Sequence, residues 1–205
     1  MDVIFEILLF GFFIVVLMIP FVLLFVAVIR FESRRMATQH QLLSKSSGLS
    51  LMTIERFAQW RLPKLSNPAG TLTVYSKPGN TYVHNPGKPR FRSLETVIEA
   101  KLNREFEQVK IFQRRGAHQN SILGVDSCIK IEGNEADFAL LLQSELGSAL
   151  AAWAGSNRGL FGNMGYFEIS GKCAKFTLPA ITNKKLRLEA ERAIVVLKVL
   201  QSLPT

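Results

Sequence analysis

Three histidines, His40, His84 and His118, are the first residues whose side chains could bind a metal or move a proton near neutral pH. None of them stands at the spacing of a metal motif, such as two histidines flanking a glutamate on one helix face, or beside a Cys-x-x-Cys pair. The chain also has no Gly-x-Ser-x-Gly turn of the kind that presents a nucleophilic serine. We therefore predict no catalytic residue, no metal and no cofactor.

The two cysteines, Cys128 and Cys173, fall in stretches that alternate like β-strands. Two cysteines are too few for a disulfide scaffold, and a cysteine in a strand usually behaves as a small buried apolar residue. A reactive thiolate would need a cation facing it, but Lys172 precedes Cys173 directly, and adjacent strand residues point to opposite faces. The sequence predicts that both cysteines are structural.

A glycine-rich stretch at residues 155–165, GSNRGLFGNMG, suggests a phosphate loop in which backbone amides, assisted by Arg158, surround an anion. Phosphate loops, however, follow a strand and open a helix. This stretch follows a predicted helix and leads into a predicted strand. We interpret it as a helix-to-strand connection.

Basic residues form the remaining candidate site. The stretch 82–92, YVHNPGKPRFR, combines cations with aromatic residues in an expected exposed loop, and a second group follows the apolar N-terminal segment. Such residues could contact anionic lipid or an acidic partner, although a solvated loop with Phe91 folded inward remains the alternative. The candidate contact residues are Arg30, Arg34, Arg35, Lys88, Arg90 and Arg92.

The element that must position these residues is an apolar segment at residues 7–29, which carries no charge. As a helix it would extend about 34 Å, enough to cross a hydrocarbon core of about 30 Å. A cleaved signal peptide is disfavoured because no Lys or Arg precedes Arg30 and because the apolar run is too long. The sequence predicts a single transmembrane helix, with the lipid bilayer as its first partner.

The flanking charges predict the orientation of that helix. Asp2 and Glu6 precede it, whereas three arginines follow it directly. Since Lys and Arg near a span stay on the cytoplasmic side, we expect the N-terminus outside and the C-terminal part in the cytoplasm, in an inner or plasma membrane.

The positive charge is concentrated next to the predicted span. The formal net charge is +9, and residues 30–118 hold 16 Lys and Arg against 6 Asp and Glu, whereas residues 119–205 hold 9 against 8. Anionic lipid and nucleic acid both attract such a cluster. No helix-turn-helix, zinc-finger or RNP-type pattern accompanies it, so the membrane surface is favoured over nucleic acid.

The rest of the chain predicts an α+β fold. We expect an anchor at 1–30, a juxtamembrane linker at 31–50 and one domain at 51–205, with a subdivision near 114–127 left open. That domain should begin with an antiparallel meander and end with a strand–helix–strand–strand–helix unit. The expected strands are 56–62, 71–76, 81–84, 96–102, 106–112, 128–132, 166–170 and 173–178, the last two joined by a hairpin at Gly171-Lys172, and the expected helices are 135–153 and 184–203.

These observations favour a membrane-anchored binding or scaffolding module, whose cytoplasmic domain contacts the anionic inner leaflet or a membrane or cytoplasmic protein partner. Two alternatives stay open. The chain could be an accessory subunit held in a larger membrane complex by its span. It could also be an enzyme on membrane-proximal substrates, with residues gathered from the loops at 114–126 and 155–165.

Overall fold

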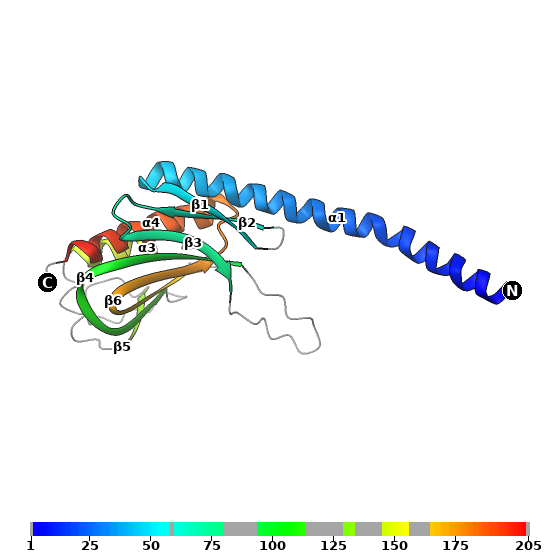
Figure 1. Cartoon of the computed structure of the whole chain (residues 1–205). Helices are drawn as coiled ribbons and strands as arrows, with labels where there is room; N and C mark the ends of the chain where they lie inside the picture. Colours follow the sequence, from blue (N-terminus) through cyan, green and yellow to red (C-terminus); the bar gives the residue numbers. More distant parts are fainter. Residues whose placement is uncertain are drawn as a thin grey trace.

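The computed structural model describes residues 2–57, 60–79, 94–113, 129–133, 145–155 and 165–203. Within them a long N-terminal helix, α1 (Asp2–Ser47), leads into an antiparallel sheet and two more helices (Figure 1). This arrangement confirms the predicted α+β class. The other elements are β1 (Ser50–Phe57), β2 (Trp60–Ser66), β3 (Leu72–Pro78), β4 (Leu94–Gln113), β5 (Ile129–Gly133), α3 (Glu145–Gly155), β6 (Tyr166–Pro179) and α4 (Lys184–Ser202).

The sheet is built around β4. Its strands follow the order β1-β2-β3-β4-β5, and β6 pairs with β4 along the other edge. The first half of β4 thus lies between β3 and β6, and residues 109–112 lie between β5 and β6. The predicted strands 96–102 and 106–112 are two parts of this one strand, which continues through exposed polar residues at 103–105.

The predicted hairpin at Gly171-Lys172 is wrong. Both flanking segments belong to the single strand β6, because β4 is 20 residues long and pairs with both of them. Gly171 has a φ of +55°, a left-handed conformation that glycine adopts without steric cost, and the pairing register shifts where it faces Phe106. The turn signal therefore marks a bend inside a strand.

The helices bury their apolar stripes on one face of the sheet. Helix α4 begins at Asn183, whose side chain accepts a hydrogen bond from the backbone of Leu186 at 3.0 Å, as an N-cap should. The spacing of three and four residues predicts a buried stripe on this helix, and all six of its members are buried: Leu186, Ala190, Ala193, Ile194, Leu197 and Leu200. Trp153 of α3 packs edge-on against Phe167 and Phe176 of β6, with ring centroids 4.9 and 5.8 Å apart. Helix α3 runs to Gly155, two residues beyond the expected end at 153, while residues 135–144 of the expected helix lie outside the described residues.

Two N-terminal expectations differ from the structure. The stretch 31–50, expected as a linker, is helical as far as Ser47 and buries Met36 and Leu43. The strand expected at 56–62 is replaced by a hairpin of β1 and β2, in which Pro63 lies opposite Ile54. Pro63 is tolerated there because β2 meets β3 only at its last two residues. The expected strand 81–84 and boundary 114–127 lie outside the described residues.

Candidate functional site

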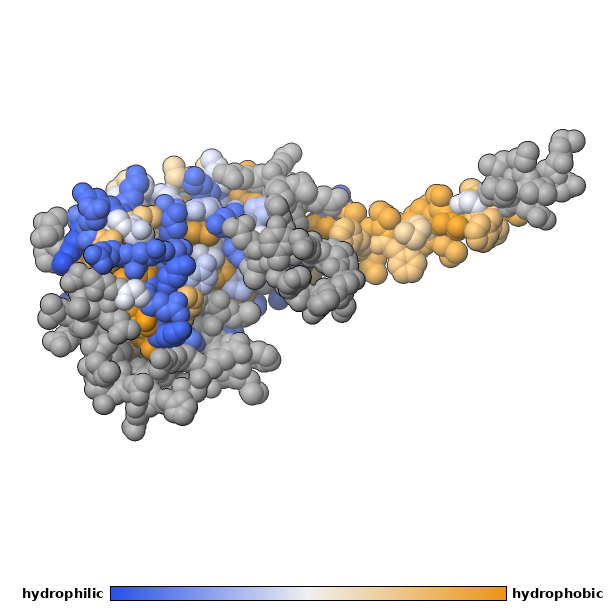
Figure 2. All heavy atoms as spheres, turned by 90° about the horizontal axis from the view of Figure 1, so that it is seen from below, coloured by the Kyte–Doolittle hydropathy of each residue, from blue (hydrophilic) through white to orange (hydrophobic). Residues whose placement is uncertain are grey.

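Helix α1 has two parts with opposite surroundings. From Leu9 to Phe31 its large apolar side chains are mostly 43–69% exposed, and no other described element covers them. Figure 2 shows this part as an apolar rod that projects from a domain on which the coloured residues of the visible face are mostly hydrophilic. The helix is long and apolar enough to cross a membrane. A core helix of a soluble protein would be mostly buried, whereas the apolar part of α1 is bare.

The second part of α1 is fixed to the domain through α4. Arg187 of α4 donates a hydrogen bond to Gln39 at 3.2 Å and pairs with Glu191 one turn later. The same carboxylate accepts a hydrogen bond from Ser46 at 2.6 Å. These bonds, together with the burial of Met36, attach the helix to the domain without a flexible joint.

The predicted contact residues fall into two groups. Arg30, Arg34 and Arg35 are exposed on α1 directly after its apolar part. Arg35 pairs with Glu32 at 3.0 Å and lies 5.6 Å from the centre of the Phe31 ring. The other predicted contact residues, Lys88, Arg90 and Arg92, lie outside the described residues.

A polar cluster lies on the sheet face opposite the helices. Glu99 of β4 accepts hydrogen bonds from Tyr75 at 3.1 Å and from the Cys173 thiol at 3.4 Å, and Lys175 lies 3.9 Å away. Burial, with Glu99 adding to it, raises the pKa of Tyr75 to about 12 and raises that of Cys173. A thiol held protonated is a poor nucleophile. The hydrogen bonds of Glu99 connect β4 with β3 and β6, which is a structural role.

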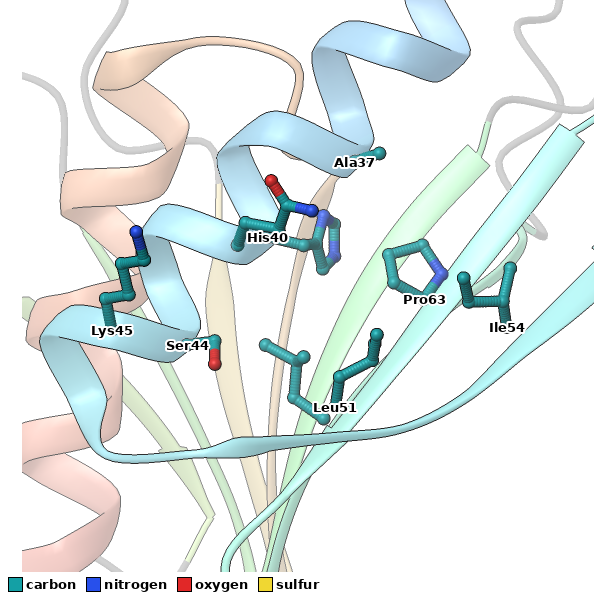
Figure 3. Close-up of a pocket in the computed structure, with 9 residues that line it drawn as sticks. Ala37, His40, Ser44, Lys45, Leu51, Ile54 and Pro63 are labelled. Carbon is teal, nitrogen blue, oxygen red and sulfur yellow. The ribbon is translucent and has the colours of Figure 1, made fainter.

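A groove runs between α1 and the β1–β2 hairpin. Its volume is about 380 Å³, within the range of small-molecule sites. Its apolar wall comes mainly from the strands, and its polar residues come from α1 (Figure 3). The lining residues are Ala37, His40, Gln41, Ser44, Lys45, Leu51, Ile54, Pro63 and Leu65.

His40 is the most deeply buried of the polar residues that line this groove. Its side chain is 1% exposed, and Nδ1 lies 2.9 Å from the carbonyl oxygen of Met36. Since a carbonyl only accepts, Nδ1 carries the proton and Nε2 presents a lone pair. Among the described residues Nε2 has no hydrogen-bond partner. Burial lowers the pKa of His40, although the bond to Met36 acts in the opposite direction.

Sequence reasoning missed this groove. His40 falls in the stretch 31–50 that the sequence predicts as a linker, and no motif connects it with Pro63 or Ile54, because only the docking of α1 brings them together. The available signal was indirect, namely an apolar spacing at Met36, His40 and Leu43 that continues a helix beyond the span.

The described residues contain no group of three or more His, Cys, Asp or Glu close enough to hold a metal. The one buried carboxylate of α4, Glu189, accepts a hydrogen bond from the backbone of Gly165 at 2.8 Å. It therefore holds the start of β6 against α4. Of the predicted loop 155–165, only its first and last residues are described.

No family model and no curated protein matches the chain. A crystal structure of the mycobacterial trehalose monomycolate transport factor A, TtfA, is similar to it with a TM-score of 0.45 and 13% identity. The match covers 86% of this chain and 99% of that one. No functional property is transferred at this level of similarity.

Proposed function

We propose that this protein is a single-pass membrane protein whose α+β domain lies in the cytoplasm and acts as a binding module at the membrane surface. The observation that carries the proposal is the continuity of α1. One helix is bare and apolar in its first part and packed on the domain in its second part. The domain is therefore held at the end of the span and cannot drift on a linker.

The short distance to the bilayer supports a role at its surface. Met36, the first large buried side chain of α1, lies seven residues beyond position 29, which corresponds to about 10 Å along a helix. This is close to a Debye length at physiological salt, so anionic headgroups act on the basic residues of the domain. Arg30 and Arg34 are exposed there, and no acid among the described residues lies within ion-pair distance of either.

The partner is the anionic inner leaflet or a membrane or cytoplasmic protein with an acidic surface. We assign this contact to the two basic groups, 30–35 and 88–92, because the arginines of the first are exposed on α1 and the second combines cations with aromatic residues in the sequence. Binding is favoured over catalysis because, among the described residues, Glu99 and its partners join neighbouring strands, and the Ser44 hydroxyl in the groove donates its hydrogen bond to the carbonyl of Leu49.

Protease accessibility tests the orientation. The full chain with a C-terminal tag, produced in bacterial cells, should stay in membranes after a carbonate wash. Protease should leave the tag intact in spheroplasts and remove it in inverted vesicles, because the cations after the span hold that side in the cytoplasm. Removal of the tag in spheroplasts would contradict the proposal.

A charge-reversed variant is the matched control. Moving the cations to the other end, with Asp2→Lys and Glu6→Lys combined with Arg30→Gln, Arg34→Gln and Arg35→Gln, should make a fraction of the tag digestible in spheroplasts. Unchanged protection would show that flanking charge does not set the orientation.

A further inference from the structure

We propose that the groove between α1 and the β1–β2 hairpin binds one alkyl chain of a membrane lipid whose head carries a hydroxyl group. The hydroxyl donates a hydrogen bond to Nε2 of His40, and the chain lies along Leu51 and Ile54. The inference rests on the proposed function in one respect, because the membrane that the span crosses supplies the lipid.

The polar lining of the groove defines the head of the ligand. A buried lone pair without a donor costs about 1–3 kcal/mol, so a ligand that brings a donor recovers that energy. The carbonyl of Met36 fixes Nε2 as the acceptor, which excludes a carboxylate or another pure acceptor as its partner. The amide of Gln41, which also lines the groove, can both accept from a hydroxyl and donate to it.

The walls of the groove define the tail. Among the described residues its apolar lining consists of aliphatic residues and a proline, with no aromatic side chain on which a planar ring would stack. On the strand side Leu51 and Ile54 are 51% and 53% exposed, which leaves aliphatic surface for an alkyl chain to cover. This lining fits an alkyl chain better than a ring or a charged metabolite.

The position of the groove defines the source of the ligand. Ala37, the lining residue nearest the span, lies eight residues beyond position 29, or about 12 Å along the same helix. A lipid can therefore reach the groove from the bilayer along the surface of α1. A peptide or a second copy of the chain remains a different occupant, which the test below would reveal.

Photo-cross-linking in phosphatidylcholine nanodiscs tests the proposal on the full chain. The probe is 1-monopalmitoylglycerol with a diazirine in its chain, and the comparator is its dimethyl ether, which keeps the chain and loses both donors. Mass spectrometry should locate the cross-links of the probe on residues of β1 and β2 that line the groove. Labelling no greater than that of exposed residues outside the groove would overturn the proposal.

Two tryptophan variants on β1 distinguish labelling inside the groove from labelling elsewhere on the same strand. Ile54→Trp fills the groove and should lower its labelling about tenfold or more, since the buried methylene contacts are lost. Met52→Trp is the matched control, because Met52 is 62% exposed on the same strand and does not line the groove. Equal labelling in the two variants, or a dimer that Ile54→Trp dissociates, would overturn the assignment of a lipid.

His40→Phe tests the head group. Wild type should prefer the probe over its dimethyl ether by about three- to tenfold, the value of one hydrogen bond, and the variant should lose this preference. Should His40→Phe fail to fold, His40→Leu gives the same comparison. Labelling in nanodiscs does not depend on orientation in cells, so a failed protease test and a failed labelling test are distinguishable.

Discussion

At the residue scale, His40 combines burial with a single hydrogen bond, and this makes it sensitive to protonation. Its pKa is lowered from 6.5 by burial, so the unfolded chain binds a proton more readily than the folded one. A group of this kind contributes stability that is present above the unfolded pKa and declines as the pH falls below it. Of the other groove residues Lys45 is charged, and those from β1 and β2 are apolar.

We therefore expect the free energy of unfolding to fall between pH 6.5 and 5, by at most about 1.4 kcal/mol per pH unit from this residue. His40→Leu should remove that part of the pH dependence. Urea denaturation of both proteins in detergent, followed by Trp153 fluorescence at pH 7 and pH 5.5, checks this. An equal difference between the two pH values in both proteins would contradict it.

At the element scale, β6 keeps pairing with β4 because a glycine lets it bend. Gly171 lies in the left-handed region, and a Cβ built there would meet no atom within 4 Å. The cost of a side chain at this position is therefore one of backbone conformation alone.

Gly171→Ala should lower the free energy of unfolding by about 1–2 kcal/mol, and Gly171→Asn should lower it less, because asparagine tolerates this conformation better. The neighbouring exposed Ser170 provides the control, since Ser170→Ala should change stability by less than about 0.5 kcal/mol. Urea denaturation ranks the three variants. A similar loss for Ala and Asn would show that the strain lies elsewhere.

At the scale of the whole molecule, α1 is both the membrane anchor and part of the domain core. Met36 and Leu43 are fully buried, and Leu49 just beyond the helix is 3% exposed. Each large side chain of this kind contributes about 1.5–3 kcal/mol on burial, and domains are stable by only about 5–15 kcal/mol.

A fragment of residues 31–205 should therefore fold without the span, whereas a fragment of residues 50–205 should lose several kcal/mol or fold incompletely. Circular dichroism melting and binding of a hydrophobic dye to both fragments check this, the dye reporting the uncovered surface of β2 and α4. Equal melting temperatures would show that the second half of α1 is dispensable.

The sequence by itself determined the features that depend on local pattern. A long uncharged apolar run predicts a membrane helix, Asn183 and the stripe of α4 predict that helix and its buried face, and closely spaced strands predict an antiparallel sheet. Orientation and the basic contact residues stay predictions, because they depend on lipid and partners. These features can be predicted because each depends on residues that lie close together in the sequence.

Tertiary structure decided what distant residues do together. Whether residues 31–47 link or pack depends on α4, about 150 positions away, and whether Gly171 turns or bends depends on the length of β4. The groove exists only because the β1–β2 hairpin packs against α1. This packing buries His40, which the sequence places in a linker, and leaves its Nε2 as an acceptor. A periodic apolar stripe shows that a segment packs on something, but it does not identify the distant segment on which it packs.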